Sequence, residues 1–458
     1  MQSKTLYSVG LDVGTTTTQM VISRLQVENQ SSGFTVPRMV IGEREVVYES
    51  PVIFTPMENQ LVDGKAIIAF MDAQYEAAGL QKAQIDTGAV IVTGETSRKE
   101  NAHQVLSNLS GAAGSFVVAT AGPDLESILA AKGAGATEFS RQTGQRILHI
   151  DIGGGTSNMA LIEEGQVVST GCLNVGGRLL KLDENGKIQY KSPVLEGLTS
   201  LKVGDSPTLQ ELTLLAQLLC SALEMASGRK PETALLRQLE TKESQRPWIV
   251  PEGELTVSFS GGVADCIEEE KDPFAYGDLG VLLGQAIRKS ALCAAPYRIG
   301  RQTIRATVIG AGCHSTALSG STVYRKNVSL PLKNLPVVQI PYKKCLEADF
   351  SAAVREKLQQ VDSANGVLLL KNLPQMDYAM LTAVATQLGA LPLQPLMICM
   401  EQDFGKALGQ KISLLYPDKP ILCLDGLLFD GQSYLDVGSP VGPCYSVVIK
   451  TLVLQKNE

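Results

Sequence analysis

Two stretches of this chain carry nearly the same pattern: an apolar strand with one Asp, a tight turn of Gly and Thr, and a second apolar strand. The first covers residues 9–22 and the second covers residues 147–162. Asp12 aligns with Asp151, and the turn residues that follow them align as well. One such hairpin is common in proteins, but two of them predict a duplicated α/β fold that closes on one ligand from both sides.

Each hairpin combines groups that suit a polyphosphate and a metal ion. A carboxylate at the end of a buried strand is unfavourable unless it is paired, hydrogen-bonded or bound to a metal. Glycines allow positive φ, so that consecutive backbone N–H groups form an anion-binding nest to which threonine hydroxyls add donors. We therefore expect Asp12 and Asp151 to hold Mg²⁺. The residues expected to contact phosphates are Gly14, Thr15, Thr16, Thr17, Gly153, Gly154, Gly155 and Thr156.

Composition excludes several other classes of protein. The net charge of −7 argues against non-specific nucleic-acid binding, which depends on Lys and Arg to neutralise phosphates. No apolar run reaches the roughly 18 residues of a membrane span, and no signal peptide is expected. The nine cysteines form no CxxC pair, which fits reduced thiols in the cytoplasm better than a disulfide framework. With three histidines, a structural zinc site has few ligands to draw on.

Strand and helix patterns alternate along the chain, which is typical of layered α/β folds. We expect two related halves over residues 1–140 and 141–298, and a separate C-terminal α/β domain over residues 299–458. An amphipathic helix is expected over residues 66–78, and further helices over residues 124–132, 208–225, 280–295, 350–361, 379–388 and 404–413. Buried strands of the C-terminal domain are expected over residues 366–370, 397–400 and 421–424.

Neither hairpin has the GxxxxGK[ST] pattern of a P-loop. Instead, the order of motifs resembles that of the actin/Hsp70/sugar-kinase ATPase superfamily, in which the two hairpins correspond to phosphate 1 and phosphate 2. Residues 122–133 resemble the first connecting helix, residues 257–265 the adenosine loop, and residues 274–287 the second connecting helix. The resemblance implies actin-like (ribonuclease H-like) ATPase domains around a nucleotide cleft that binds ATP and Mg²⁺.

The same resemblance assigns the remaining site residues. Gly261 and Gly262 are implied to contact adenosine, although a second Gly-rich turn over residues 308–316 could take that role. Hsp70-like proteins place a Glu before the Pro of the first connecting helix, where it helps to order the attacking water. This chain has Gly122 at that position, so Asp124 or Glu126 could replace it. The implied catalytic residues are Asp12, Asp151 and Glu126.

The whole chain is also similar to one narrower family, the large ATPase components that reactivate ethanolamine ammonia-lyase. The stretches that suggest this are residues 9–20, 93–103, 310–320, 437–443 and 448–452. The resemblance implies a chaperone-like reactivating factor that uses ATP to exchange damaged cobalamin on the lyase for intact adenosylcobalamin. Because the DxHxxG pattern is absent, we do not expect this chain to bind cobalamin tightly itself.

Other functions stay open at this point: another ATPase chaperone, a small-molecule kinase, or an actin-like filament protein. The expected partner is ethanolamine ammonia-lyase, with no nucleic acid and no membrane. The sequence leaves open whether the protein forms a homo-oligomer. It also leaves open whether it works free in the cytoplasm or with a bacterial microcompartment.

Overall fold

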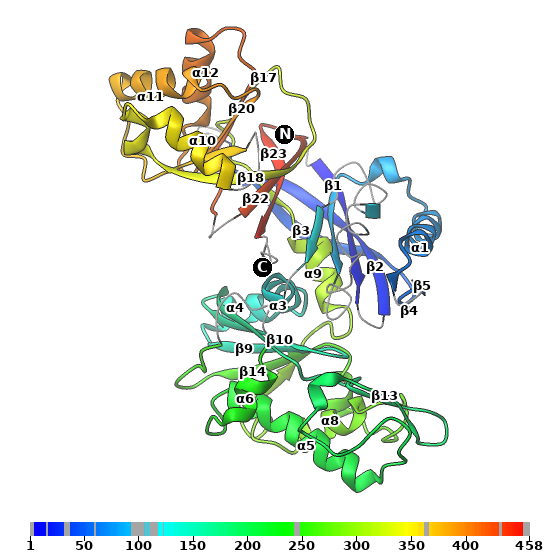
Figure 1. Cartoon of the computed structure of the whole chain (residues 1–458). Helices are drawn as coiled ribbons and strands as arrows, with labels where there is room; N and C mark the ends of the chain where they lie inside the picture. Colours follow the sequence, from blue (N-terminus) through cyan, green and yellow to red (C-terminus); the bar gives the residue numbers. More distant parts are fainter. Residues whose placement is uncertain are drawn as a thin grey trace.

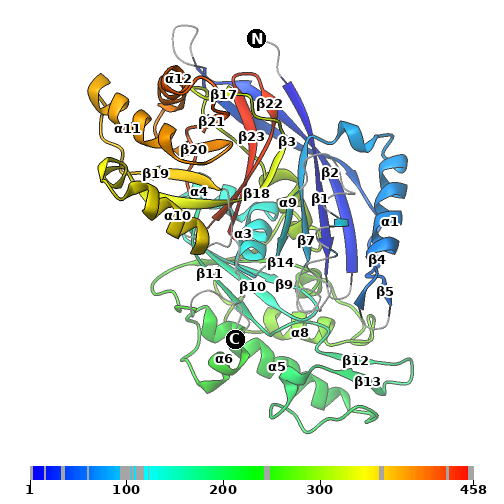
Figure 2. The same cartoon turned by 45° about the horizontal axis from the view of Figure 1, so that its top comes forward.

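The computed structural model describes residues 4–14, 17–31, 37–58, 61–92, 105, 108–109, 118–121, 123–241, 248–360, 366–429 and 433–451. Figure 1 shows two α/β halves, the first mostly blue and the second cyan to green, and a third α/β body in yellow to red. The third body lies against the first half in both Figure 1 and Figure 2. In the part of the chain that the structure describes, no helix has the length and apolar character needed to span a membrane.

The first sheet has the strand order β3 (Met39–Glu49), β2 (Thr17–Asn29), β1 (Lys4–Val13), β7 (Thr87–Val92) and β8 (Val118–Ala121). The first three strands are antiparallel, whereas β7 and β8 run parallel to β1. Helix α1 (Gly64–Ala77) packs its buried side chains on one face of this sheet. The Asp63 carboxylate caps α1 by accepting hydrogen bonds from the first free backbone N–H groups.

The second sheet repeats this arrangement, which confirms the predicted duplication. Its order is β11 (Gln166–Leu173), β10 (Ser157–Glu163), β9 (Ile147–Ile152), β14 (Thr256–Ser260) and β15 (Tyr297–Ile299). Again the first three strands are antiparallel and the last two run parallel to the central strand. The two aspartates hold equivalent positions, because Asp12 pairs with Ile91 of β7 and Asp151 pairs with Ser260 of β14.

Helices α3 (Pro123–Gly133) and α9 (Ala306–His314) cross between the two sheets (Figures 1 and 2). Helix α3 follows the first sheet in the chain but contacts β9, β10 and β11, whereas α9 follows the second sheet and contacts β1, β2 and β7. Glycine permits the crossing: a Cβ on Gly133 would lie 1.9 Å from the Ala306 carbonyl oxygen. Likewise, a Cβ on Gly310 would lie 2.0 Å from the Leu129 carbonyl oxygen. Each half therefore supplies a helix that packs on the sheet of the other.

This symmetry corrects two assignments made from the sequence. The counterpart of α3 is α9, so residues 274–287 are not the second connecting helix. In that region, α8 (Gly280–Arg288) packs on α5 (Leu209–Ala226) and α7 (Asp265–Glu268) instead. The expected Gly-rich turn over residues 308–316 is wrong as well, because most of that segment is helical. Its glycines serve close packing: Gly310 meets α3, and Gly312 meets Gly10 of β1.

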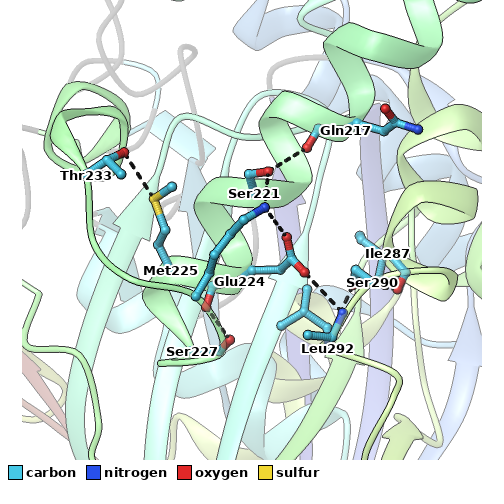
Figure 3. A network of polar contacts seen from close by, with 11 residues as sticks. Gln217, Ser221, Glu224, Met225, Ser227, Thr233, Ile287, Ser290 and Leu292 are labelled. Carbon is cyan, nitrogen blue, oxygen red and sulfur yellow. Dashed lines mark hydrogen bonds and ion pairs between the residues drawn. The ribbon is translucent and has the colours of Figure 1, made fainter.

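Helix α5 (Leu209–Ala226) covers the far side of the second half, and polar contacts fix its C-terminal end (Figure 3). The Lys230 ammonium donates to Ser221 Oγ at 2.9 Å and to Glu224 Oε2 at 3.1 Å. The other carboxylate oxygen of Glu224 accepts the backbone N–H of Ala291, 3.1 Å away. This network ties α5 to the segment that follows α8. The helix begins with a capping box formed by residues 208 and 211, as its sequence favours.

The third body is a mixed sheet with helices on one face. Its strand order is β16 (Ala317–Leu318), β23 (Cys444–Thr451), β22 (Ser433–Val441), β18 (Leu332–Pro341), β19 (Val367–Lys371), β20 (Leu396–Met400), β21 (Ile421–Leu424) and β17 (Tyr324–Lys326). The C-terminal helices expected from the sequence are confirmed as α10 (Phe350–Gln360), α11 (Tyr378–Ala390) and α12 (Gly405–Leu415). Helix α9 follows the expected domain boundary at residue 298 in the chain, yet it packs on the first sheet. The domain limits expected from the sequence stay predictions.

Candidate functional site

A cavity of about 250 Å³ lies between the two halves, where β1 and β9 end. The two hairpin turns, the first turns of α3 and α9, and the turn after β14 form its wall. Every predicted site residue within the described ranges lines this cavity, whereas Thr15 and Thr16 lie outside those ranges. The lining residues are Asp12, Gly14, Thr17, Gln19, Glu126, Asp151, Gly153, Gly154, Gly155, Thr156, Gly177, Arg178, Gly261, Gly262, Val263, Asp265, Cys266, Tyr276, Asp278, Gly280, Ile304 and Thr307.

The two hairpin turns have the same backbone hydrogen bond. In the first turn, the Gly14 N–H donates to the Thr17 carbonyl oxygen at 2.9 Å. In the second turn, the Gly153 N–H donates to the Thr156 carbonyl oxygen, also at 2.9 Å. Each glycine stands two residues after an aspartate of the cavity wall. The repeat read from the sequence is therefore also a repeat of local geometry.

The glycines after β14 have different tasks. Gly261 has φ +85°, and a Cβ there would lie 2.3 Å from the Ile152 carbonyl oxygen, so this residue must be Gly for the turn to pack against β9. Within the described part of the chain, a Cβ on Gly262 would have one neighbour within 4.0 Å, the tip of Ile304. Open space in front of Gly262 leaves room for a ligand to approach the backbone. Gly261 is thus needed for the conformation of the turn, whereas Gly262 exposes backbone that a ligand can contact.

Three carboxylates come together from both halves. Glu126 projects from the first turn of α3 into the cavity that Asp12 and Asp151 also line. Burial and the nearby charges of Asp12 and Asp151 raise the pKa of Glu126 well above its ordinary value. Asp124 does not line the cavity, because its carboxylate accepts a hydrogen bond of 2.7 Å from Thr170 Oγ1 on β11. Of the two candidates that the sequence left open, Glu126 is therefore the one that lies in the cavity, and its catalytic role stays a prediction.

Hydroxyl groups hold both oxygens of the Asp151 carboxylate. Ser260 Oγ donates to Asp151 Oδ1, and Thr307 Oγ1 donates to Oδ2 at 3.4 Å. Burial raises the pKa of Asp151 to about 6, and these two hydrogen bonds lower it in part. Behind Ser260 lies His149, which is 0% exposed and whose pKa burial lowers to about 3. His149 was not among the residues predicted for the site.

The raised pKa of Asp151 predicts a pH-dependent stability difference. A carboxyl group with a raised pKa in the folded state binds its proton more tightly there, so it destabilises the fold once pH exceeds that pKa. Asp151→Asn removes this penalty and should raise the unfolding free energy by about 3 kcal/mol near pH 8. The advantage should shrink as pH falls through about 6 and vanish near pH 4. Denaturant unfolding of both proteins across this range measures it; an advantage independent of pH would contradict the prediction.

The cavity wall also contains an ion pair that was not predicted from the sequence. Arg178 Nε donates to Asp278 Oδ2 at 3.0 Å, and Asp278 Oδ1 accepts the Gly280 N–H at 2.8 Å. Among the described residues that line the cavity, Arg178 is the only cationic side chain. The acidic lining residues are Asp12, Glu126, Asp151, Asp265 and Asp278. The cavity is therefore strongly acidic, and its one cation is already paired.

Comparison with known proteins gives consistent results along the whole chain. A family model described as "Ethanolamine utilisation protein EutA" matches residues 4–455. A protein of Salmonella typhimurium named "Ethanolamine ammonia-lyase reactivase EutA" is 38% identical over 483 aligned positions, covering 99% of this chain and 99% of that protein. The protein of the same name from Escherichia coli is 36% identical over 480 positions, with the same coverage.

Solved structures align with parts of the chain at low sequence identity. Component A of (R)-2-hydroxyglutaryl-CoA dehydratase from Acidaminococcus fermentans is 14% identical with a TM-score of 0.36, covering 67% of this chain and 96% of that one. The ethanolamine utilization protein EutJ from Carboxydothermus hydrogenoformans is 15% identical with a TM-score of 0.35, covering 67% and 89%.

Proposed function

Because the chain belongs to the EutA family of ethanolamine utilisation proteins, we propose that it is an ATP-dependent reactivase of ethanolamine ammonia-lyase. Full-length relatives that carry the reactivase name support this reading over a kinase or a filament protein. The observation that carries the ATP part is the pair of matching turns that line one acidic cavity between two duplicated halves. Such a site can grip a polyphosphate from both sides.

The backbone groups of the cavity suit a nucleotide. The turns at residues 14–17 and 153–156 would provide N–H and hydroxyl donors for the β- and γ-phosphates. Gly262 would let adenosine approach the backbone closely, while Gly261 keeps the turn in shape. The loop after the second hairpin supports this wall, since the Gly177 N–H donates to the Gly153 carbonyl oxygen at 3.0 Å.

The donor set also fits a divalent cation. Five acidic residues line the cavity with a single, paired arginine, so a polyphosphate would meet strong repulsion without a cation beside it. In the described part of the chain, no three His, Cys, Asp or Glu side chains stand close enough to ligate one ion directly. Mg²⁺ commonly keeps several waters and binds through one or two carboxylates. Asp12 and Asp151 would hold such a hydrated ion, which would supply charge neutralisation of the phosphates.

ATP hydrolysis in this site would rest mainly on positioning and electrostatics. Glu126 lies in the same cavity as both aspartates and would orient the attacking water. Because α3 and α9 each pack on the sheet of the other half, hydrolysis of the nucleotide in the cavity would shift one half relative to the other. This movement would loosen the lyase, so that damaged cobalamin leaves and intact adenosylcobalamin enters.

The role of Glu126 is tested with a matched neighbour on the same helix. Glu126→Gln should lower the rate of ATP hydrolysis about 100-fold, because the amide cannot accept a proton from water. Asp124→Asn changes a carboxylate that contacts Thr170 and does not line the cavity, so it should change the rate less than about twofold. Steady-state phosphate release measures both. Equal loss in the two variants would show that α3 acts through folding rather than through Glu126.

The function as a whole is tested by reactivation. Purified protein, inactivated ethanolamine ammonia-lyase, ATP, Mg²⁺ and adenosylcobalamin are mixed, and deamination of ethanolamine is followed. Activity should return only when ATP and Mg²⁺ are both present. No recovery, or equal recovery without ATP, would refute the proposal. A phosphorylated small molecule would indicate a kinase, and ATP-dependent sedimentation would indicate a filament.

The setting of this activity is part of the proposal. The partner would be the lyase, in the cytoplasm or in a bacterial microcompartment that encloses it. Gel filtration of the protein alone and mixed with the lyase would establish whether it forms a homo-oligomer and whether the complex is stable. The C-terminal body, which packs against the first sheet through Leu6, Val27 and Val441, would move together with that half.

A further inference from the structure

A buried row of polar side chains leads from the interior of the second sheet to the cavity. His149 on β9 and Ser258 on β14 are paired residues of adjacent parallel strands, and so are Asp151 and Ser260. Side chains two residues apart on a strand point to the same face, so all of them lie on one side of the sheet. His149, Ser258 and Ser260 are each 0% exposed, and Asp151 is 7% exposed.

The hydrogen bonds along this row have one consistent direction. Ser260 has a single hydroxyl proton, which it donates to Asp151 Oδ1. Its oxygen lies 2.9 Å from His149 Nε2, so it must accept a proton from that nitrogen. His149 Nδ1 lies 3.1 Å from Ser258 Oγ, so both ring nitrogens have a hydroxyl partner.

The first half has no equivalent of this row. The positions that correspond to His149, Ser258 and Ser260 are Gly10, Ala89 and Ile91, as the pairing of β1 with β7 shows. Gly10 has no side chain because α9 packs there: a Cβ on Gly10 would lie 2.3 Å from the Val308 carbonyl oxygen. The duplicated fold therefore does not require a polar row at this place. Its presence in one half only points to a task for Asp151 rather than to stability of the sheet.

We propose that His149 is a positioning residue, whose Nε2–H fixes the direction of the Ser260 hydroxyl and through it the Asp151 carboxylate. This inference rests on the proposed function, in which Asp151 holds the hydrated cation of a bound nucleotide. With Ser260 and Thr307 each donating to one oxygen, the carboxylate keeps one rotamer before any ligand arrives. Groups that orient a metal-binding side chain commonly change metal affinity 10- to 100-fold when removed.

A pair of amide substitutions separates this role from mere packing. His149→Gln places an amide N–H near the position of Nε2 and can still donate to Ser260, whereas His149→Asn reaches only the position of Nδ1. We expect H149Q to keep the wild-type response to Mg²⁺ and H149N to lose it. Ser260→Ala should behave like H149N. His314→Asn is the matched control, because His314 ends α9 and does not line the cavity.

The measurement is calorimetric binding of ADP with and without Mg²⁺. In H149N and S260A, the Mg²⁺-dependent gain in ADP affinity should fall about tenfold, while affinity without Mg²⁺ changes less than about twofold. Equal affinities in H149N, H149Q and the unchanged protein would overturn the proposal. The proposal also fails if both amide variants unfold, because the Gln side chain is expected to replace the Nε2 donor of His149 and the Asn side chain is not.

A second measurement needs no ligand. The chain has three histidines, so nitrogen NMR of histidine-labelled protein can assign the His149 ring by comparison with H149Q. We expect Nε2 of this ring to carry a proton, because it must donate to Ser260 Oγ. An Nε2 without a proton would refute the assignment. Because this result does not depend on hydrolysis or on the lyase, it stays informative if the proposed function is wrong.

Discussion

Replacing Asp12 or Asp151 with alanine is expected to lower the rate of ATP hydrolysis by about 100-fold or more. Preorganised charges that act on the reacting phosphates typically contribute rate factors of this order, and the two aspartates occupy equivalent positions at the ends of β1 and β9. The expected defect is in turnover and in the dependence on Mg²⁺. Phosphate release measured over a range of Mg²⁺ concentrations would show both effects.

The two variants should differ in stability although they share the loss of activity. Asp151 is 7% exposed and its pKa is raised, so replacing it with alanine removes the free-energy cost of burying its charge. Unfolding curves of each variant therefore accompany the rate measurement and exclude misfolding as its cause. Asp124→Asn is again the matched control, since it changes a carboxylate outside the cavity. Near-normal turnover in both alanine variants would refute the site.

Gly133→Ala is expected to destabilise the protein by about 3 kcal/mol, at the upper end of what overpacking usually produces. The added methyl group would lie 1.9 Å from the Ala306 carbonyl oxygen and 2.8 Å from the Gly310 nitrogen, both backbone atoms of α9. Backbone cannot move aside as a side-chain tip can, so the two helices would have to separate. Since α3 and α9 connect the halves, ATP hydrolysis should fall together with stability.

The control for this substitution is Gly64→Ala at the start of α1. Among the described residues, a Cβ there would meet the Val105 methyl groups, at 3.6 and 3.7 Å, which is ordinary van der Waals contact. Its stability should change by less than about 0.5 kcal/mol. Denaturant midpoints of the three proteins give the comparison. A Gly133→Ala protein as stable as Gly64→Ala would show that the crossing of α3 and α9 is looser than the structure indicates.

Much of the cavity could be read from the sequence because its main parts are local. An Asp, a Gly-containing turn and two apolar strands lie within about twenty residues of each other, and short-range backbone preferences define them. The C-terminal helices could also be predicted from the sequence, since their apolar residues recur at helical spacing. Thr15 and Thr16 lie outside the described residues, so their expected phosphate contacts stay predictions.

Other features depended on packing between distant segments. Asp124 and Glu126 stand two positions apart on one helix and so point in different directions, and only the position of α3 between the sheets shows that Glu126 faces the cavity. Gly310 and Gly312 suggest a turn in sequence, because glycine is unfavourable within helices. In the folded protein they are favoured by the close approach of α9 to α3 and β1.

The duplication, the aspartate of each half and the glycines of the turns could be predicted from the sequence, since residues adjacent in the chain define each of them. The folded structure was needed to show which acidic residue of α3 joins the aspartates and how the connecting helices exchange between halves. It was also needed to show that His149 and Ser260 support one aspartate alone. The hydrogen bonds of Ser260 to His149 and Asp151, for example, join strands that are more than a hundred residues apart in the chain. No local pattern encodes them, because they depend on sheet register and helix packing.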